Sequence, residues 1–333
     1  MKNNGIIRFA TVGTSAICEQ FIASAKTVPS LKHTVVYSRS YEKGLAFATK
    51  TGCEKVYTNI EELAASSEID AVYIASPNVF HSIQSRIFLK GGKHVICEKP
   101  IAVSYEEYLE TKRIADQNGL IYMDAMKSCN IPWHKDIENA VKRLGNIAVA
   151  RIDFCQRSSR YDAFMAGIPQ NIFDMSLHAG ALMDLGVYCV YAAVDLLGEP
   201  KNITAGASFF ENGCDHSGTT VFDYGNFQAV LTYSKAGQSA LGSEIIGENG
   251  SLKISSISQF VGVSSLDKNG EETEIVPYYD RIKVMSGEAA CFADFINGKD
   301  LQEYKKRNTL CEKVMRCMDE IKQSAGIVYG DIK

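Results

Sequence analysis

The chain has 333 residues, of which 46% are hydrophobic and 22% charged, as is ordinary for a globular protein. This length exceeds what one hydrophobic core usually fills, so two domains are expected. The formal net charge of −4 gives no electrostatic reason to expect a nucleic acid or an anionic membrane as a partner. The ten cysteines form no Cys-x-x-Cys pair or Cys/His cluster, which predicts a reducing compartment and no metal site.

Two features of the sequence, its N-terminus and the length of its apolar stretches, indicate the same location in the cell. The N-terminus leads directly into a strand pattern, which predicts no signal peptide. We also expect no apolar stretch of the roughly 18 residues that a membrane span needs. The sequence therefore predicts a cytoplasmic protein.

Strand and helix patterns alternate through residues 1–124. Apolar runs predict strands at Ile6–Val12, Thr34–Tyr37, Val56–Tyr57, Ala71–Ala75, His94–Cys97 and Leu120–Met123. Amphipathic stretches predict helices at Ala16–Thr27, Tyr41–Thr51, Ile60–Ala65, Phe80–Lys90 and Tyr105–Asn118. This alternation predicts an α/β domain in which a doubly wound parallel sheet carries helices on both faces.

The pattern changes after about residue 125. Helical patterns cover Pro132–Arg143, Ala179–Leu197, Glu288–Ile296 and Thr309–Ala325. Strand patterns cover Ile147–Gln156 and then the region Asn202–Ile275, with turn residues at Asn226, Glu248–Gly250 and Lys268–Gly270. We therefore expect a second domain over 125–333 in which helices accompany successive antiparallel strands.

A phosphate-binding loop is predicted where the first strand meets the first helix. The residues there are Gly13, Thr14, Ser15, Ala16 and Ile17. They stand where a Gly-x-Gly-x-x-Gly loop would lay a pyrophosphate on a helix N-terminus. Ser15 replaces the second glycine but is small enough to let the backbone approach a phosphate. A plain strand-to-helix turn is the alternative reading.

The end of the second strand indicates which dinucleotide binds. NAD enzymes usually place an acidic residue there to accept from the ribose 2′-hydroxyl. Ser38 and Arg39 stand at this position instead. A hydroxyl and a guanidinium suit a 2′-phosphate, which favours NADP(H) over NAD(H). An exposed loop arginine without function is the other reading.

The loop after the fourth predicted strand contains Ser76 and Asn78, with His81 one helical turn later. In a doubly wound sheet this loop lies beside the central ribose and nicotinamide of the cofactor. These residues are therefore predicted to bind the cofactor. A surface position at the start of a helix is the equally weighted alternative for His81.

Lys99 directly follows the apolar run His94–Cys97 and Glu98, and it precedes Pro100. Ligands of open α/β sheets bind at the carboxyl ends of the strands, where this lysine is expected. A lysine held there can polarise a substrate or handle a proton. An ordinary surface lysine at the end of a strand is the alternative.

The long predicted helix carries Asp184 and Tyr188, which share a face because they are four residues apart. Gly186 between them is unfavourable in a helix by about 1 kcal/mol relative to alanine, which suggests a close approach to the backbone. Polar side chains on an otherwise apolar helix need polar partners, and Lys99 is the predicted one. An ammonium near a phenol favours the phenolate.

Together these segments resemble the Gfo/Idh/MocA family, which includes glucose–fructose oxidoreductase and myo-inositol dehydrogenase. The segments that carry the resemblance are Gly13–Ile17, Ser76–Asn78 with His81, Gly92–Pro100 and Gly180–Tyr188. The resemblance extends over nearly the whole chain. The Glu-Lys-Pro and Asp-x-Gly-x-Tyr motifs at this separation are its most specific part.

The resemblance implies an NAD(P)-binding Rossmann domain over 1–124. It implies a substrate-binding and oligomerisation domain over 125–333 with a large, open, mainly antiparallel sheet. Lys99 would be the catalytic lysine, with a cis peptide bond before Pro100, and Glu98 would adjoin the cofactor. Tyrosine at 188 is similar to the branch of dihydrodiol and D-xylose dehydrogenases, because inositol dehydrogenases carry histidine there. Lys127 follows Ala125-Met126, where that branch often has an aromatic residue, and is predicted to contact the substrate.

The expected function is NADP(H)-dependent hydride transfer at a secondary alcohol or hemiacetal, most simply of a sugar or polyol. In the oxidative direction Tyr188 takes the hydroxyl proton, Lys99 supports the phenolate, and Asp184 orients a substrate hydroxyl or Lys99. The alternatives are a dihydrodiol-type reductase, a bilin-type reductase and a non-catalytic NADP-binding sensor. The partners expected are a small molecule and a second copy of the chain, in a homodimer or larger assembly, and no metal is required.

Overall fold

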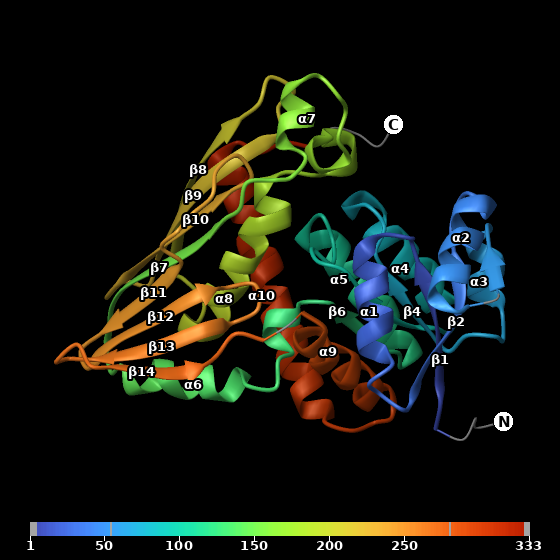
Figure 1. Ribbon diagram of the computed structural model, residues 1–333, viewed down its shortest axis with the longest axis horizontal. Coiled ribbons are helices and arrows are strands. Elements are labelled where there is room, and N and C mark those ends of the chain that lie inside the picture. The colour runs from blue at the N-terminus through green and yellow to red at the C-terminus, as the bar shows by residue number, and fades with distance from the viewer. Residues whose placement is uncertain (1–4, 54, 280, 330–333) are drawn as a thin grey trace. The chain divides into compact units, whose positions relative to one another are not determined.

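The computed structural model describes residues 5–53, 55–279 and 281–329. The prediction of no signal peptide rests on the N-terminus, whose first four residues lie outside these ranges. The chain forms two compact units (Figure 1). The first contains Met1–Ile131 and Asp280–Thr309, and the second contains Pro132–Tyr279 and Leu310–Lys333.

The first unit contains a six-stranded sheet in the order β3-β2-β1-β4-β5-β6, in which every pair is parallel. Its strands are β1 (Ile7–Val12), β2 (Leu31–Tyr37), β3 (Lys55–Tyr57), β4 (Ala71–Ile74), β5 (His94–Cys97) and β6 (Tyr122–Asp124). The helices between them are α1 (Ala16–Ala25), α2 (Tyr41–Thr51), α3 (Ile60–Ala65), α4 (His81–Lys90) and α5 (Tyr105–Asn118). This is the predicted doubly wound fold, and each predicted strand and helix is confirmed within a few residues.

Helix α9 (Arg281–Ile296) returns to the first unit from late in the chain. Its buried Met285 and Phe292 share one core with Phe9 of β1 and Phe21 of α1. Burying these apolar side chains is the main stabilising contribution that the helix can make. The sequence predicts residues 281–309 in the second domain, whereas in the structure they belong to the unit with the parallel sheet.

The second unit contains an eight-stranded sheet in the order β14-β13-β12-β11-β7-β10-β9-β8. Its strands are β7 (Ile147–Cys155), β8 (Asn202–Phe209), β9 (Asp215–Asp223), β10 (Gln228–Ser234), β11 (Ser243–Gly247), β12 (Gly250–Ser256), β13 (Val261–Asp267) and β14 (Glu272–Val276). The predicted hairpin turns join β9 to β10, β11 to β12, and β13 to β14. One central pair, β7 with β10, is parallel, whereas the other pairs in this sheet are antiparallel.

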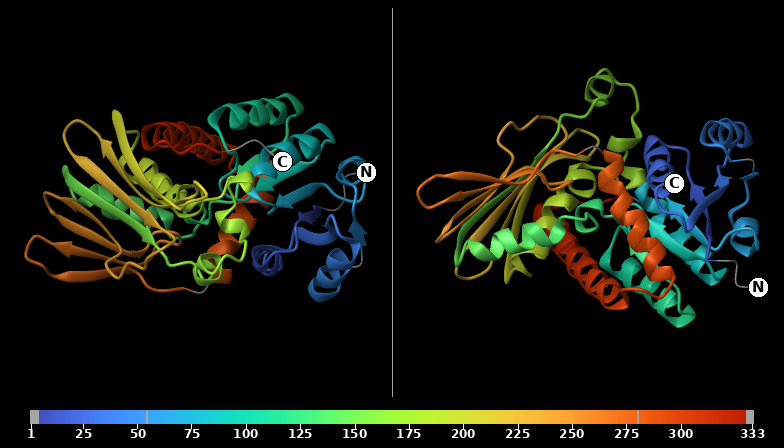
Figure 2. Two further views of the ribbon diagram at one scale, coloured as in Figure 1. Left: turned by 90° about the horizontal axis from the view of Figure 1, so that it is seen from above. Right: turned by 60° about the horizontal axis from the view of Figure 1, so that its bottom comes forward.

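Helices lie on one face of this sheet (Figures 1 and 2). They include α6 (His134–Arg143), α8 (Val187–Leu197) and the C-terminal part of α10 (Leu301–Ala325). Alternate residues of the central strands point into this layer and are buried, as Ala150, Ile152, Leu231 and Tyr233 are. Their neighbours along β7 and β10 point to the other face and are half-buried or exposed. Within this unit, therefore, the sheet is covered on one side.

The segment between β7 and α8 is more structured than the sequence indicates. It contains α7 (Tyr161–Met165), short 3₁₀ turns at Asn171–Phe173 and Met175–Leu177, and a π-helical turn at Leu182–Gly186. The predicted helix Ala179–Leu197 therefore begins with a π-turn and becomes α-helical at Val187. π-turns are rare and are often found at functional sites.

One segment, Met175–Leu197, is long and apolar enough to cross a membrane by length and composition, contrary to the expectation from the sequence. Of its most apolar window, 78% is buried inside the structure. A core helix passes the same test, and the α8 side chains Val187, Val190 and Ala193 are completely buried.

Candidate active site

The loop between β1 and α1 has the geometry of a phosphate cradle. Gly13 has a φ of +118°, and a Cβ there would lie 2.9 Å from the Ala75 carbonyl oxygen, so only glycine fits. Ser15 is the N-cap of α1, and its side chain makes no capping bond. Ser15 and Ala16 are exposed, with Thr14 and Ile17 beside them partly so. The helix N-terminus is therefore open to an anion.

The end of β2 presents the predicted 2′-phosphate residues side by side. Ser38 is buried, and its Oγ accepts a hydrogen bond of 3.3 Å from the Ser40 N–H. Arg39 is exposed, and its guanidinium carbon lies 5.7 Å from the centre of the Phe80 ring. The guanidinium is thus held by a cation–π contact at the surface of the first unit.

The loop after β4 contains Ser76 and Asn78, and His81 is buried at its end. One ring nitrogen of His81 lies 2.8 Å from the Ser76 carbonyl oxygen, and the other lies 2.8 Å from that of Pro100. Burial lowers the pKa of His81, and the two carbonyls oppose that effect. The surface alternative for His81 is therefore wrong, and the ring ties the β4 loop to the residue after Lys99.

The Glu98-Lys99-Pro100 segment leaves the carboxyl end of β5, as predicted, and the Lys99–Pro100 peptide bond is cis. The Glu98 carboxylate accepts a hydrogen bond from the Tyr73 hydroxyl and one of 3.2 Å from the Lys99 N–H. Glu98 therefore fixes the backbone from which the Lys99 side chain extends.

The sequence analysis missed Glu288, which α9 brings next to this segment. Glu288 is 0% exposed, and neither carboxyl oxygen has a hydrogen-bond partner within the described part of the chain. Burial, and next the negative charge of Glu98, raise the pKa of Glu288 well above its usual range, whereas Lys127 acts in the opposite direction. Lys127, predicted to contact the substrate, is thus a buried cation among acidic neighbours. Its predicted role remains untested.

In the second unit Asp184 lies in the π-turn and Tyr188 in the first turn of α8. Tyr188 is 5% exposed, and its ring meets Phe154 edge to face at 5.5 Å. A Cβ at Gly186 would lie 3.1 Å from the Tyr233 ring, which is the close approach that the sequence predicted. The predicted partner of Asp184, Lys99, belongs to the first unit, so that pairing stays a prediction. Within its own unit Asp184 pairs with Lys235 at 3.0 Å.

Asp215 at the start of β9 holds the other end of this turn. Its Oδ2 accepts a hydrogen bond of 2.7 Å from the Leu182 N–H. Burial raises the pKa of Asp215 to about 6, although the bond from Leu182 and the charge of Lys235 oppose the rise. A Cβ at Gly180 would overlap Asp215 Oδ1 at 1.9 Å. Sequence reasoning missed Asp215 and Lys235, but Lys235 follows a strand directly, which is the signal that singled out Lys99.

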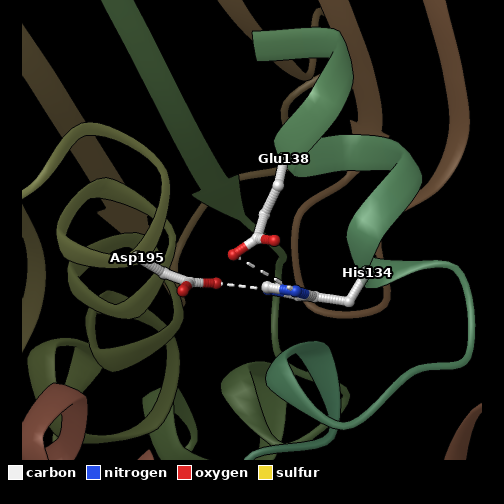
Figure 3. A group of neighbouring side chains, drawn as sticks. All are labelled: His134, Glu138 and Asp195. Carbon is white, nitrogen blue, oxygen red and sulfur yellow. Dashed lines mark hydrogen bonds and ion pairs between the residues drawn. The ribbon is translucent and has the colours of Figure 1, made fainter. Parts of the chain in front are cut away.

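One further group contains possible metal ligands: His134, Glu138 and Asp195 (Figure 3). Their ligand atoms lie within 4.8 Å of one another. His134 Nε2 lies 2.5 Å from Asp195 Oδ2, and Nδ1 lies 3.9 Å from Glu138 Oε1. The two carboxylates thus face different nitrogens of one ring, and this arrangement joins α6 to α8 without converging on one point.

Comparison with known proteins agrees with the fold and the motifs. Residues 7–125 match the model of an oxidoreductase family with an NAD-binding Rossmann fold, Gfo/Idh/MocA, and residues 140–253 match the model of its C-terminal domain. The scyllo-inositol 2-dehydrogenase (NADP⁺) IolU of Bacillus subtilis is 37% identical over 97% of this chain and 98% of its own. A trans-1,2-dihydrobenzene-1,2-diol dehydrogenase of Xenopus laevis is 26% identical over 97% and 99%.

A solved structure has the same fold. It is a 3-ketoreductase from Actinomadura kijaniata in complex with NADP and TDP-benzene, with a TM-score of 0.83 and 20% identity, covering 96% of this chain and 98% of that one. The family models span most of the chain, and a relative above 30% identity spans nearly all of it. The chain therefore belongs to the Gfo/Idh/MocA family of oxidoreductases.

Proposed function

We propose that the protein transfers hydride between NADP(H) and a secondary alcohol or the corresponding ketone of a polyol or sugar. The observation that carries this proposal is the full-length similarity, at 37% identity, to an NADP⁺-dependent inositol dehydrogenase. The chain keeps the lysine, aspartate and tyrosine of the predicted chemistry in Lys99, Asp184 and Tyr188. This set argues against a non-catalytic sensor.

The residues of the first unit fit the cofactor. The cradle that a Cβ would fill at Gly13 admits a pyrophosphate, and the exposed N-terminus of α1 provides N–H donors and a favourable dipole. Ser38 and Arg39 offer a hydroxyl and a guanidinium where an acidic residue would repel a 2′-phosphate. When bound, the nicotinamide supplies the hydride chemistry.

The side chains of the protein then have to transfer the proton and orient the substrate. We assign Tyr188 as the acid/base that takes the hydroxyl proton during oxidation and returns it during reduction. The Lys99 ammonium supports the phenolate form and stabilises the negative charge that develops on the reacting oxygen. Asp184, one helical turn before Tyr188, accepts a hydrogen bond from a second hydroxyl of the substrate. A polyol has such a hydroxyl next to the reacting one.

We also propose a cytoplasmic location. Eight of the ten cysteines are buried and two are half-buried, and the described part of the chain shows no disulfide between them, as is typical of a reducing compartment. Burial raises the pKa of several of these thiols, including Cys18 to about 11, which keeps them protonated and unreactive.

The test is a turnover screen of the purified full-length chain. NADP⁺ or NAD⁺ is mixed with inositol isomers, aldoses, linear polyols and dihydrodiols, and reduction is followed at 340 nm. We expect turnover with at least one polyol or sugar and a preference for NADP⁺. Turnover restricted to dihydrodiols would replace the polyol proposal. Tight NADP⁺ binding without turnover in either direction would support the sensor.

A further inference from the structure

Lys235 in the second unit pairs its ammonium with the Asp184 carboxylate. Lys235 Nζ lies 3.0 Å from Asp184 Oδ2. The Lys235 side chain is only 3% exposed, whereas that of Asp184 is 41% exposed. The cation is therefore sealed inside the second unit, while the carboxylate that it holds is open to a ligand.

Both the backbone and the ammonium of Lys235 have partners within the second unit. The Lys235 N–H donates to the His216 carbonyl oxygen at 2.8 Å, and the Ser158 N–H donates to the Lys235 carbonyl oxygen at 2.8 Å. Its Nζ donates to the Ile172 carbonyl oxygen at 3.0 Å and lies 5.1 Å from the centre of the Phe173 ring. Besides Asp184, the ammonium thus has two neighbours, the Ile172 carbonyl oxygen and the Phe173 ring, and its backbone is hydrogen-bonded on both sides, which leaves it little freedom to follow a moving carboxylate.

Such an arrangement is a poor way to gain stability. Removing an ammonium from water costs several kcal/mol, and a buried ion pair is often no more stable than apolar side chains of equal volume. The main effect of the pair is on the charge and the orientation of the Asp184 carboxylate. A nearby fixed cation favours the ionised carboxylate, and a bond from one side restricts its orientation.

Other titratable groups surround the pair. The Lys235 charge acts on Asp215 of β9 and on Cys214, the residue before this strand. Tyr188 lies one turn further along the helix of Asp184. Burial raises the pKa of Cys214 to about 12, so this thiol carries no charge near neutral pH. Burial raises the pKa of Asp215 to about 6, so Asp215 gains its charge only as the pH passes that value. The Lys235 charge therefore acts on two carboxylates, that of Asp184, which it pairs with, and that of Asp215, whose pKa is about 6.

We propose that Lys235 is a positioning residue for catalysis: it keeps the Asp184 carboxylate ionised and aimed at a hydroxyl of the substrate. This inference rests on the proposed function, because it assigns Asp184 to substrate binding. Replacing Lys235 should weaken the binding of a polyhydroxylated substrate and leave the affinity for NADP⁺ unchanged, since the nucleotide residues belong to the first unit.

The first measurement is kinetic. Lys235→Met keeps most of the aliphatic side chain and removes the charge. We expect kcat/KM for the best polyol to fall roughly 10–100-fold, the range expected when a hydrogen bond to a charged group is lost, and mainly through KM. The acidic limb of kcat/KM should move to higher pH. The matched control is Lys253→Met, because Lys253 also pairs with a carboxylate, Glu272 at 3.7 Å, but at an exposed position of the same sheet.

The second measurement does not depend on turnover. Protein labelled with ¹³C-carboxyl aspartate is titrated by NMR, and the Asp184 signal is assigned by its loss in Asp184→Asn. The Asp184 titration midpoint should rise by about one pH unit or more in Lys235→Met. Lys235→Arg retains the charge, so it should keep the midpoint near that of the wild type while only partly restoring kcat/KM, because a planar guanidinium cannot reproduce the ammonium geometry.

These measurements separate the possible outcomes. An inactive wild type in which the Asp184 midpoint still depends on Lys235 would refute the proposed function and leave the electrostatic role intact. The inference would be overturned if the Asp184 titration midpoint were unchanged in Lys235→Met and if the activity of this variant fell only as much as its amount of folded protein. The inference would also be overturned if Lys235→Met lowered kcat/KM by the same factor in the Asp184→Asn variant as in the wild type. If Lys235 acts through Asp184, removing Lys235 should have little effect once the Asp184 carboxylate is gone.

Discussion

At the scale of single residues, we expect the choice between NADP⁺ and NAD⁺ to depend on Arg39. Its guanidinium is exposed and lies over the Phe80 ring, and among the described residues it forms no ion pair that an anion would have to break. Arg39→Ala should weaken NADP⁺ binding about 10–100-fold, since a charge-assisted bond contributes roughly 1.5–3 kcal/mol. NAD⁺ affinity should change little because NAD⁺ has no 2′-phosphate.

Isothermal titration with both nucleotides measures this selectivity. Lys43→Ala is a suitable control, because Lys43 is also an exposed cation near the start of α2. An equal loss for both nucleotides would show that Arg39 only stacks on the adenine and does not read the 2′-phosphate.

The proton-transfer assignment is also a matter of single residues. Tyr188→Phe should lower kcat by about 10²–10⁴, the usual contribution of a general acid–base, and leave the NADP⁺ affinity nearly unchanged. Lys99→Met should do comparable damage. The double variant should lose far less than the product of the two, because groups that act as a unit are not additive.

Tyr191→Phe is the matched control for this set, since it removes a phenol hydroxyl from a buried position of the same helix. Full turnover in Tyr188→Phe would remove Tyr188 from the mechanism. Fully multiplicative losses in the double variant would mean that Lys99 and Tyr188 act independently, against the predicted pairing.

At the scale of elements, the π-turn before α8 is held by a carboxylate from outside the turn, that of Asp215. Asp215 accepts from the Leu182 N–H, and burial raises the pKa of Asp215 to about 6 from its usual 3.8. At a pH between these two pKa values, the Asp215 carboxyl has already lost its proton in the unfolded chain but retains it in the folded chain. The contribution of Asp215 to stability is therefore full below about pH 4 and is lost as the pH rises to about 6.

Asp215→Asn keeps an oxygen that can accept from Leu182 but cannot ionise. Relative to the wild type, it should gain stability as the pH rises from 4 to 7, by an amount on the order of 3 kcal/mol. Calorimetric Tm values of both proteins at several pH values measure this difference. A difference that does not change with pH would show that Asp215 does not titrate in this range.

How far the sequence predicts these elements depends on what each one is built from. The parallel strands were predictable because a strand buried on both faces is a continuous apolar run, as in His94–Cys97. The π-turn was not predictable, because Asp215 and Lys235, thirty and fifty residues further along the chain, hold it in place. The amphipathic pattern of α9 predicts an apolar face but does not predict which of the two cores this face packs against. The position of Glu288 near Glu98 was therefore not predictable either.

At the scale of the whole molecule, the face of the eight-stranded sheet that the helices of its own unit leave uncovered predicts self-association. Taking strands about 4.8 Å apart and seven residues at about 3.4 Å each, this face measures roughly 800 Å², the area per partner of a standard interface. Many of its side chains are small and uncharged, such as Thr219, Val221, Val230 and Thr232. We therefore expect a homodimer or larger assembly that buries this face.

Val230→Arg tests this surface, because Val230 lies on β10 opposite Val221 on one side and Arg151 on the other. A new cation there adds repulsion to Arg151 and must lose its water if the face is buried. Light scattering at micromolar concentration should give the wild type at least twice the chain mass of 36.6 kDa and the variant a single chain mass. Leu109→Arg, which adds the same charge at an exposed apolar position of α5, should leave the assembly unchanged. A monomeric wild type would refute the prediction, and a Val230→Arg variant that still associates would move the interface to another surface.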